Sequence, residues 1–482
     1  MKKLICVILL LVISMSFASC KKEENGNTVL NVYASIDYKS VLTHSPNDKQ
    51  AKLMKWVKET FESENKGVTV NYQVKGWGDA LNSAMLKDLN TSGKNAPDIF
   101  IGEEYVRNFI SLGTFAEIKL DEGIESDIIP AVKDYISKDG KIYAAPLYTG
   151  TYGISINTKV LRDVGVLDKN NEVTQNFKDA LKATVGNSAY QQVDDIDDVN
   201  PLCPETWEDL LLICQYIKNY FDENNQVNNG AMVLSNIKGD SRWKTLAWLR
   251  TAGADYADKD GKPDVYGENA VKAYEMIRSL SQTASSYTGI VNATGGTQAM
   301  YSAFFGGKAA YIIEGAELLA RSYQYPSFND ADLYTAELPC YEFNVSEKKG
   351  NALVGTIYYS INKNKPENYE IQNKFINFLM SEKTMYEFYE KDMRIPTRTS
   401  VLRSEKISEG GEMYNARLQP FFKAVLSDEY SFSGGLVGFS NNAALVWEKW
   451  ESYIGKVYGG SGQISSMLEK LQSEMLSVYN RK

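Results

Sequence analysis

The chain has 482 residues, 43% of them hydrophobic, with 52 basic and 61 acidic side chains and a formal net charge of −9. This length supports two or three compact units, and the acidic balance argues against a nucleic-acid partner. The single histidine, His44, rules out a zinc site built from histidine pairs and leaves one residue for histidine-dependent catalysis. We therefore predict no catalytic residue, no metal and no cofactor.

The N-terminus predicts export. Lys2 and Lys3 precede an apolar run over 4–12, and small residues follow up to Cys20. The run is too short to span a bilayer, which needs about 20 residues. The pattern is typical of a secretory signal peptide over 1–19.

The residues before Cys20 resemble a bacterial lipobox, although Phe17 stands where such motifs usually have Leu. The resemblance implies that Cys20 is lipidated, that 20–28 form a tether, and that the mature chain is held on the periplasmic or extracellular face of the cell membrane. Cleavage near Ala18 with an incidental cysteine is the alternative.

The first third of the chain alternates β-branched runs with helical periodicity. The predicted strands are 28–35, 68–74 and 98–101, and the predicted helices are 48–64 and 79–89. This alternation predicts an α/β fold with a largely parallel sheet. Loops at the carboxyl ends of such strands bind ligands, and here they begin at Ser35, Lys75 and Gly102.

The middle of the chain continues the alternation, and helices dominate from Ser241 onward. We predict strands over 154–157 and 231–234 and a helix over 205–221 that begins with Thr206 as its N-cap. The polar stretch over 169–200 matches neither periodicity, so we predict a surface insertion.

Several segments, in this order, resemble the solute-binding proteins of ABC importers, specifically the carbohydrate-binding group that includes maltose-binding protein. They are 95–102, 140–146, 153–161, 204–210, 306–315, 374–379 and 394–397. The resemblance implies a two-lobed periplasmic-binding-protein fold, in which each lobe is a largely parallel sheet flanked by helices and crossover hinge strands join the lobes. The insertion and the long loop over 35–48 depart from the family pattern.

The resemblance also implies the domain boundaries. Lobe 1 comprises 29–150 and 310–356, and lobe 2 comprises 151–309 and 357–482. The lobes are expected to close about crossover strands near 150–154, 306–312 and 354–360, so that the ligand touches both lobes only in the closed form.

A sugar presents flat C–H faces and hydroxyl groups, which need aromatic rings and planar polar side chains. The chain has 31 Tyr and 7 Trp. By their positions, the aromatic candidates are Trp77, Tyr148, Tyr152, Trp243 and Trp447. The candidates for hydroxyl recognition are Asp37, Glu103, Glu104, Glu314 and Arg394.

Tyr358 is a further aromatic candidate, but it is adjacent to Tyr359 in a predicted strand. Neighbouring residues of a strand point to opposite faces, so only one of the two can reach a shared site.

An acidic segment over 255–264 superficially resembles a calcium loop. Its spacing fails, because Asp258, Asp260 and Gly261 do not complete the required pattern of acids before the glycine and a glutamate after it. We predict an exposed hairpin there.

The sequence thus predicts a monomeric solute-binding protein that captures a sugar or oligosaccharide between its lobes and delivers it to the membrane subunits of an ABC importer. A surface receptor or adhesin of the same shape is an alternative. A secreted glycoside-active enzyme is another, because two carboxylates among 61 acids would suffice. Receptors for polyamines or metal ions have similar two-lobed folds.

Overall fold

The computed structural model describes residues 27–35, 49–76, 78–103, 106–185, 196–226, 228–234, 240–284, 296–344, 349–409, 417–427, 430–433 and 439–481. The predicted signal peptide and five residues singled out above lie outside the described residues: Cys20, Asp37, His44, Trp77 and Glu104. Within the described part of the chain, none of the helices combines the length and the apolar character needed to cross a membrane.

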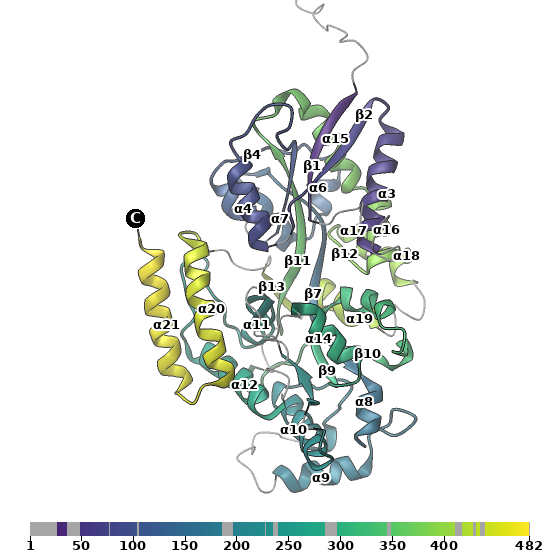
Figure 1. Cartoon of the computed structure of the whole chain (residues 1–482), viewed down its shortest axis with the longest axis vertical. Coiled ribbons are helices and arrows are strands. Elements are labelled where there is room, and N and C mark those ends of the chain that lie inside the picture. Colours follow the sequence, from purple (N-terminus) through teal and green to yellow (C-terminus); the bar gives the residue numbers. More distant parts are fainter. Residues whose placement is uncertain are drawn as a thin grey trace, which may run out of the picture.

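Two lobes lie one above the other along the long axis of the molecule, and long strands run between them (Figure 1). The strand order of the main sheet is β2-β1-β3-β11-β7-β9-β8. These strands are β1 (Thr28–Ala34), β2 (Val68–Val74), β3 (Ile99–Gly102), β7 (Ala145–Asn157), β8 (Met232–Val233), β9 (Tyr311–Gly315) and β11 (Lys349–Asn362). Shorter strands are β4 (Phe115–Ala116), β5 (Ser137–Lys138), β6 (Lys141–Ile142), β10 (Leu333–Ala336), β12 (Ile395–Pro396) and β13 (Tyr430–Ser433).

The first three strands are parallel, as predicted. β1 lies between β2 and β3, with Leu30 opposite Val70 and Val32 opposite Ile99. The crossing strands depart from the parallel arrangement, because β11 runs antiparallel to both β3 and β7. β7 then continues into the second lobe, where its C-terminal half pairs with β9.

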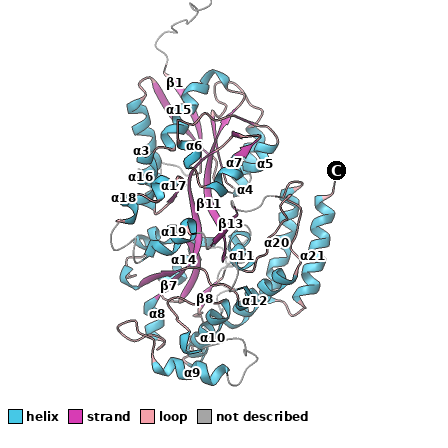
Figure 2. Ribbon diagram, turned by 180° about the vertical axis from the view of Figure 1, so that it is seen from behind, coloured by secondary structure: helices cyan, strands magenta, loops and turns pink. Residues whose placement is uncertain are grey.

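Helices cover both faces of these strands (Figure 2). Around the first lobe lie α3 (Lys49–Glu64), α4 (Gly78–Asp88), α5 (Val106–Ser111), α6 (Ile124–Asp127), α7 (Pro130–Ile136), α15 (Tyr369–Leu379), α16 (Glu382–Asp392), α17 (Thr399–Leu402) and α18 (Glu405–Ser408). Around the second lie α8 (Thr158–Asp163), α9 (Gln175–Val185), α10 (Trp207–Glu223), α11 (Asp240–Thr251), α12 (Glu268–Ala284), α14 (Gly296–Phe305), α19 (Gln419–Leu426), α20 (Ala443–Gly459) and α21 (Ile464–Tyr479).

The predicted helix start at Thr206 is confirmed. The Thr206 hydroxyl accepts a hydrogen bond from the backbone N–H of Asp209 at 3.1 Å, and the Asp209 carboxylate accepts one from the backbone N–H of Thr206, also at 3.1 Å. This reciprocal capping satisfies two backbone donors at the start of α10.

The prediction of an irregular insertion over 169–200 is wrong in part, because α9 lies within it. Phe177 and Leu181, four residues apart, are buried in the core of the second lobe. The Phe177 ring packs edge-on against Tyr216 of α10, with 4.9 Å between ring centroids. α9 is therefore an integral helix of this lobe.

The predicted assignment of the chain after residue 310 also needs correction. β9 pairs with β7 and β8 in the second lobe, although 310–356 were expected in the first. Residues after 357 were expected in the second lobe, but α15 packs on α3, where the Phe61 and Phe375 rings lie 4.9 Å apart. β11 thus carries the chain back into the first lobe.

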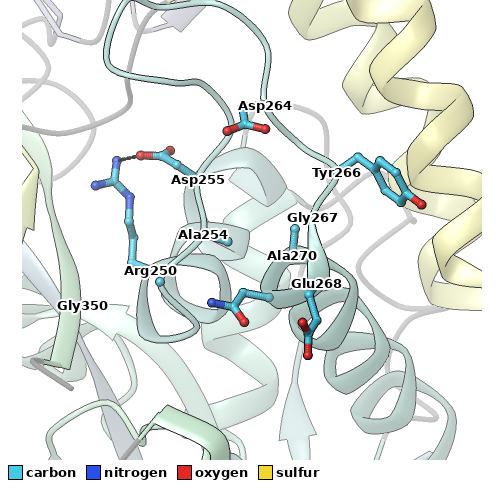
Figure 3. Close-up of a pocket in the computed structure, with 11 residues that line it drawn as sticks. Arg250, Ala254, Asp255, Asp264, Tyr266, Gly267, Glu268, Ala270 and Gly350 are labelled. Atoms are coloured by element: carbon cyan, nitrogen blue, oxygen red, sulfur yellow. Dashed lines mark ion pairs between the residues drawn. The ribbon is translucent and has the colours of Figure 1, made fainter. Parts of the chain in front are cut away.

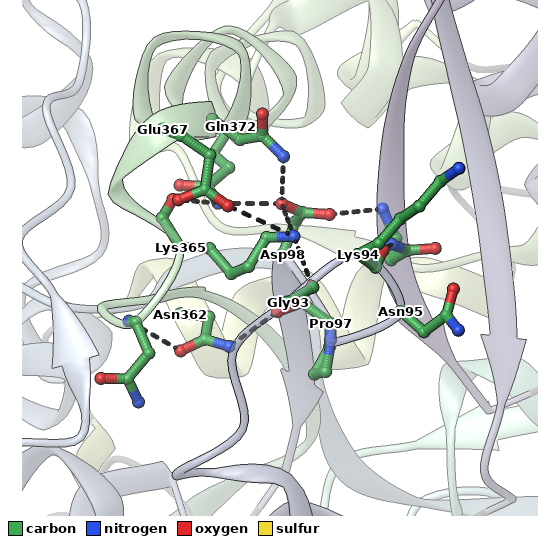
Figure 4. A network of polar contacts seen from close by, with 12 residues as sticks. Gly93, Lys94, Asn95, Pro97, Asp98, Asn362, Lys365, Glu367 and Gln372 are labelled. Atoms are coloured by element: carbon green, nitrogen blue, oxygen red, sulfur yellow. Dashed lines mark hydrogen bonds and ion pairs between the residues drawn. The ribbon is translucent and has the colours of Figure 1, made fainter.

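A buried polar network fixes this return (Figure 4). The fully buried Asp98 carboxylate accepts hydrogen bonds from the side chains of Asn368 at 2.6 Å and Gln372 at 3.3 Å. It also accepts one from the backbone N–H of Asn31 at 2.8 Å, and the Lys365 ammonium lies 3.7 Å away. The network therefore joins β1, β3 and α15 into one unit.

Candidate functional site

Two tyrosines mark the crossing strand β7 between the lobes. Tyr148 and Tyr152 are four residues apart, which places them about 13 Å apart along an extended strand. Both side chains are buried, and each forms a cation–π contact with a basic residue from a different part of the chain. Two polar clusters therefore lie on either side of the middle of β7.

The Tyr148 cluster is centred on Arg394, which precedes β12. The guanidinium carbon lies 4.8 Å from the centre of the Tyr148 ring. Its Nε donates to Asp392 at 2.8 Å, and one of its terminal nitrogens lies 3.6 Å from Glu317. Glu317 belongs to the 3-10 helix over Ala316–Gln324 that follows β9, so this cluster joins that helix to the segment before β12.

Burial and charge keep the Tyr148 hydroxyl protonated. Burial raises the pKa of Tyr148, and the positive charge of Arg394 opposes this rise. The carboxylates of Asp392, Glu103 and Glu317 add to it. Tyr148 therefore stays a neutral phenol that can both donate and accept a hydrogen bond, and the predicted candidate Glu103 lies within electrostatic reach of it.

The Tyr152 cluster is centred on a buried ion pair between Lys244 of α11 and Glu314 of β9. The Lys244 ammonium also lies 5.2 Å from the centre of the Tyr152 ring. Glu314 accepts further hydrogen bonds from the hydroxyl of Tyr301 at 3.1 Å and from the backbone N–H of Gly315 at 3.1 Å. The carboxylate is thus held in one orientation by three donors.

These clusters contain groups suited to binding. Each combines an aromatic ring with ion-paired charges whose positions are fixed by several hydrogen bonds. Such preorganised donors and acceptors can recognise polar ligand groups without first being reordered.

Comparison with known proteins agrees with this geometry. Residues 56–415 match the family model of bacterial extracellular solute-binding proteins. The chain belongs to this family. It is therefore a binding protein and not an enzyme.

Solved structures show the same fold as this solute-binding protein. The GacH receptor of Streptomyces glaucescens GLA.O, studied unliganded and with acarbose, has 20% identity, a TM-score of 0.69, and coverage of 95% of this chain and 100% of its own. The cyclic alpha-maltosyl-1,6-maltose binding protein of Arthrobacter globiformis has 18% identity, a TM-score of 0.68, and coverage of 94% and 99%. Maltose-bound MalE3 of T. maritima has 16% identity, a TM-score of 0.66, and coverage of 93% and 99%. No curated protein matches the sequence.

Five of the residues predicted from the sequence of this solute-binding protein lie in or near these two clusters. They are Glu103, Tyr148, Tyr152, Glu314 and Arg394. Trp243 is adjacent to Lys244 on α11 and is only partly buried, so it stays a candidate. Lys244, Glu317 and Asp392 were not predicted, and only their closeness in sequence to predicted residues could have indicated them.

Trp447 does not fit its predicted role. Its side chain is 2% exposed and lies in the core of the second lobe. The rings of Phe439, Tyr256 and Trp450 surround it at centroid distances of 4.8, 5.0 and 6.0 Å. The Arg242 guanidinium covers it at 5.2 Å, so Trp447 is a core residue in this conformation.

The two adjacent tyrosines of β11 face different surroundings. Tyr358 stacks on Tyr135 of α7, with ring centroids 5.4 Å apart. Tyr359 points to the other face of the strand, and burial raises the pKa of its hydroxyl. Tyr358 therefore packs against α7 in this conformation, and its role in binding stays a prediction.

A separate polar pocket of about 630 Å³ lies in the second lobe (Figure 3). Its lining contains the ion pair between Arg250 and Asp255, at 2.6 Å. Burial raises the pKa of Asp255, although the charge of Arg250 opposes the rise. Among the residues that line this pocket, none is a predicted site residue.

Proposed function

We propose that this solute-binding protein captures a carbohydrate between its lobes and delivers it to an ABC importer. The observation that carries the proposal is the pair of tyrosine and ion-pair clusters along β7, one built around Arg394 and the other around Lys244. Aromatic rings can stack on the C–H faces of a sugar, and the fixed carboxylates can accept hydrogen bonds from its hydroxyl groups.

The structural relatives support a carbohydrate over other polar solutes. Beyond the three compared above, similar structures include a protein bound with alpha-D-tagatose, another in complex with cycloalternan, and another with D-mannitol. Each of these ligands is a polyol or a sugar. The chain covers at least 97% of each relative, so the likeness extends over their whole length.

Lobe closure is the proposed mechanism. We assign the described residues of 28–144 and 362–409 to the first lobe and those of 158–344, 417–427 and 439–481 to the second, with β7 and β11 as crossing strands. Ligand that contacts both lobes only when they approach each other shifts the population toward the closed form. A micromolar affinity requires only about 8 kcal/mol of net binding free energy, which a few stacked rings and hydrogen bonds supply.

Export and anchoring complete the proposal. We infer that residues 1–19 direct secretion and that Cys20 carries the lipid, which keeps the loaded protein close to the membrane subunits of the importer. Mass spectrometry of the protein purified from membranes tests the anchor: a diacylglycerol-modified N-terminal Cys20 is expected, and an unmodified N-terminus after Ala18 would refute it.

The function itself is tested by a thermal-shift screen of the purified mature protein. The panel comprises maltose, acarbose, cycloalternan, D-tagatose and D-mannitol, with putrescine and zinc chloride as non-sugar controls. At least one sugar is expected to raise the melting temperature and to be recovered chemically intact. Stabilisation by putrescine or zinc alone, or hydrolysis of a sugar over many turnovers, would overturn the proposal.

A further inference from the structure

One edge of the main sheet lies in the first lobe. β2 is the last strand in the order β2-β1-β3-β11-β7-β9-β8, so among the described residues no strand pairs with its outer side. An edge strand presents backbone groups that can bind a strand of another chain, and soluble proteins cover or charge such edges to prevent this pairing.

The backbone of β2 faces β1 and the outer side alternately. At one end of the β1–β2 pair, Thr28 N–H donates to Gly67 O at 2.7 Å, and at the other end Lys75 N–H donates to Ala34 O at 2.8 Å. The odd-numbered residues of this segment therefore turn their backbone groups toward β1. The even-numbered residues of β2 turn theirs outward.

An ion pair of α3 occupies the outward groups in the middle of the strand. Lys58 and Glu62, one helical turn apart, form a salt bridge with each other. Lys58 Nζ donates to Val70 O at 2.6 Å, and Val70 N–H donates to Glu62 Oε1 at 2.7 Å. The ammonium thus takes the place of a neighbouring strand's N–H, and the carboxylate takes the place of its C=O. The Tyr72 hydroxyl donates to Met54 O at 3.1 Å, which fixes α3 alongside β2 (Figure 1).

A second ion pair on the same helix shows how different this arrangement is from an ordinary surface pair. Lys55 and Glu59 have the same spacing and lie 3.6 Å apart, with side chains 41% and 62% exposed. The Lys58 and Glu62 side chains are only 18% and 26% exposed. Hydrogen bonds between a charged group and the backbone are shorter and stronger than neutral ones. The Lys58–Glu62 pair is therefore well suited to hold the edge of β2.

The sequence of β2 explains why its edge needs a cover. The strand reads Val-Thr-Val-Asn-Tyr-Gln-Val over Val68–Val74 and contains no charged residue, proline or glycine. Segments of about six or seven residues with high β-propensity and low net charge tend to pair with copies of themselves. Lys66 and Lys75 flank the strand, and flanking charges limit such pairing. The middle of the strand has no charge of its own, and the Lys58–Glu62 pair lies there.

We propose that the Lys58–Glu62 pair keeps this solute-binding protein monomeric by blocking the pairing of β2 with β2 of a second copy of the chain. Removal of both side chains frees the N–H and C=O of Val70 on a strand without charge. Two such edges can pair antiparallel about a two-fold axis, because each offers the same groups to the other. The inference is independent of the ligand and of lobe closure, since it concerns one edge of the first lobe.

Sedimentation velocity tests the proposal on the mature protein, expressed without residues 1–19 so that no lipid is attached. A reducing agent prevents intermolecular disulfides through the exposed Cys203. The unchanged protein is compared with Lys58→Ala/Glu62→Ala and with the matched control Lys55→Ala/Glu59→Ala, from low to high concentration. Only Lys58→Ala/Glu62→Ala is expected to dimerise, with a dissociation constant at least about tenfold below that of any association of the other two proteins.

A third substitution locates the contact. Val74 is 46% exposed, and Val74→Lys places a charge on the edge strand, which opposes strand pairing. Added to Lys58→Ala/Glu62→Ala, it should restore the monomer. Hydrogen exchange provides an independent measurement, because the backbone amides over 68–74 should exchange more slowly in the dimer than in the monomer.

Three results would overturn the proposal. One is a Lys58→Ala/Glu62→Ala variant that stays monomeric while its far-UV circular dichroism matches that of the unchanged protein. Another is equal association of the two double variants, which would show a general effect of lost charge. The third is a dimer that Val74→Lys does not dissociate. If Lys58→Ala/Glu62→Ala does not fold, Glu62→Ala alone, which frees only the Val70 N–H, replaces it, and a folded monomer would then refute the proposal.

Discussion

The guanidinium carbon of Arg394 lies 4.8 Å from the centre of the Tyr148 ring, in a part of the molecule where both side chains are buried. The same arginine donates to Asp392, whose carboxylate also accepts a hydrogen bond from Gln50 at 3.0 Å. Gln50 lies in the first turn of α3, so one buried arginine connects the start of α3 with the crossing strand.

Replacement of Arg394 tests this connection. Arg394→Met leaves the buried carboxylate of Asp392 without its cation, so the free energy of unfolding is expected to fall by about 3–5 kcal/mol. Arg403→Met, at an exposed arginine, is the control and should change it by less than about 0.5 kcal/mol. Urea titration measures both. The double variant Arg394→Met with Asp392→Asn should recover part of the loss, and a double variant no more stable than the single one would contradict this explanation.

Two tryptophans with similar predictions from sequence should behave differently. Trp447→Ala removes a ring enclosed by three others, so it should lower the free energy of unfolding by about 3–5 kcal/mol. Trp243→Ala removes a partly exposed ring and should lower the free energy of unfolding by less than about 1.5 kcal/mol. The same change should weaken sugar binding by about 1–3 kcal/mol. Chemical denaturation and calorimetry separate the two effects. Equal free energies of unfolding for the two variants would contradict the burial of the Trp447 ring.

Gly350 allows the close approach of β11 and α11. A Cβ atom at this position would lie 1.8 Å from the backbone oxygen of Arg250. Gly350→Ala must therefore push β11 away from α11, and the free energy of unfolding is expected to fall by at least about 3 kcal/mol. Gly455→Ala is the matched control, because a Cβ there meets nothing within 4 Å and the residue lies inside α20. Gly455→Ala should raise the free energy of unfolding by about 0.5–1 kcal/mol. Thermal unfolding that shows no difference between the variants would refute the contact.

The Asp127 carboxylate should make the stability of the folded protein depend on pH in a specific way. Burial would raise the pKa of Asp127, but hydrogen bonds from Ser400 and Arg398, together with the charge of Arg398, lower it below its ordinary value. As the pH falls, the unfolded chain takes up the proton before the folded protein does. The contribution of Asp127 is therefore present above the unfolded pKa of about 4 and is lost as the pH falls through the lower folded value.

Asp127→Asn measures this contribution. At pH 7 the free energy of unfolding of the variant should be lower by about 1–2 kcal/mol, because the side chain at position 127 is no longer a charged hydrogen-bond acceptor. The difference from the unchanged protein should shrink as the pH is lowered below about 4. Asp197→Asn is the control, because the ion pair between Asp197 and Lys182 is exposed. A constant difference between pH 7 and pH 3 would contradict the role assigned to the Asp127 carboxylate.

The residue pattern correctly predicted elements whose structure depends on residues close together in the sequence. The strand over 68–74 has the predicted bounds, and the capping of α10 by Thr206 follows from residues within four positions of each other. α9 was missed because its polar flanks obscured the spacing of Phe177 and Leu181. That spacing was the available signal.

The candidate site was only partly predictable, because its contacts join distant segments. Lys244 and Glu314 are 70 positions apart, and nothing in either neighbourhood indicates the ion pair. The burial of Trp447 likewise depends on Tyr256 and Phe439. The side to which Tyr358 points depends on an irregularity in the pairing of β11 with β7, near Ile357. Such features arise from tertiary packing, which a residue pattern does not contain.

Isothermal titration calorimetry with the sugar that gives the largest thermal shift tests the central claim most directly. It compares the unchanged protein with Lys244→Met/Glu314→Gln, which neutralises the buried pair beside Tyr152, and with Lys272→Met/Glu268→Gln, which neutralises an exposed pair on α12. We predict one sugar bound per chain, at least a tenfold weaker affinity in the first variant and an unchanged affinity in the second. Binding that is equal in all three proteins, or absent from the unchanged protein, would contradict the account.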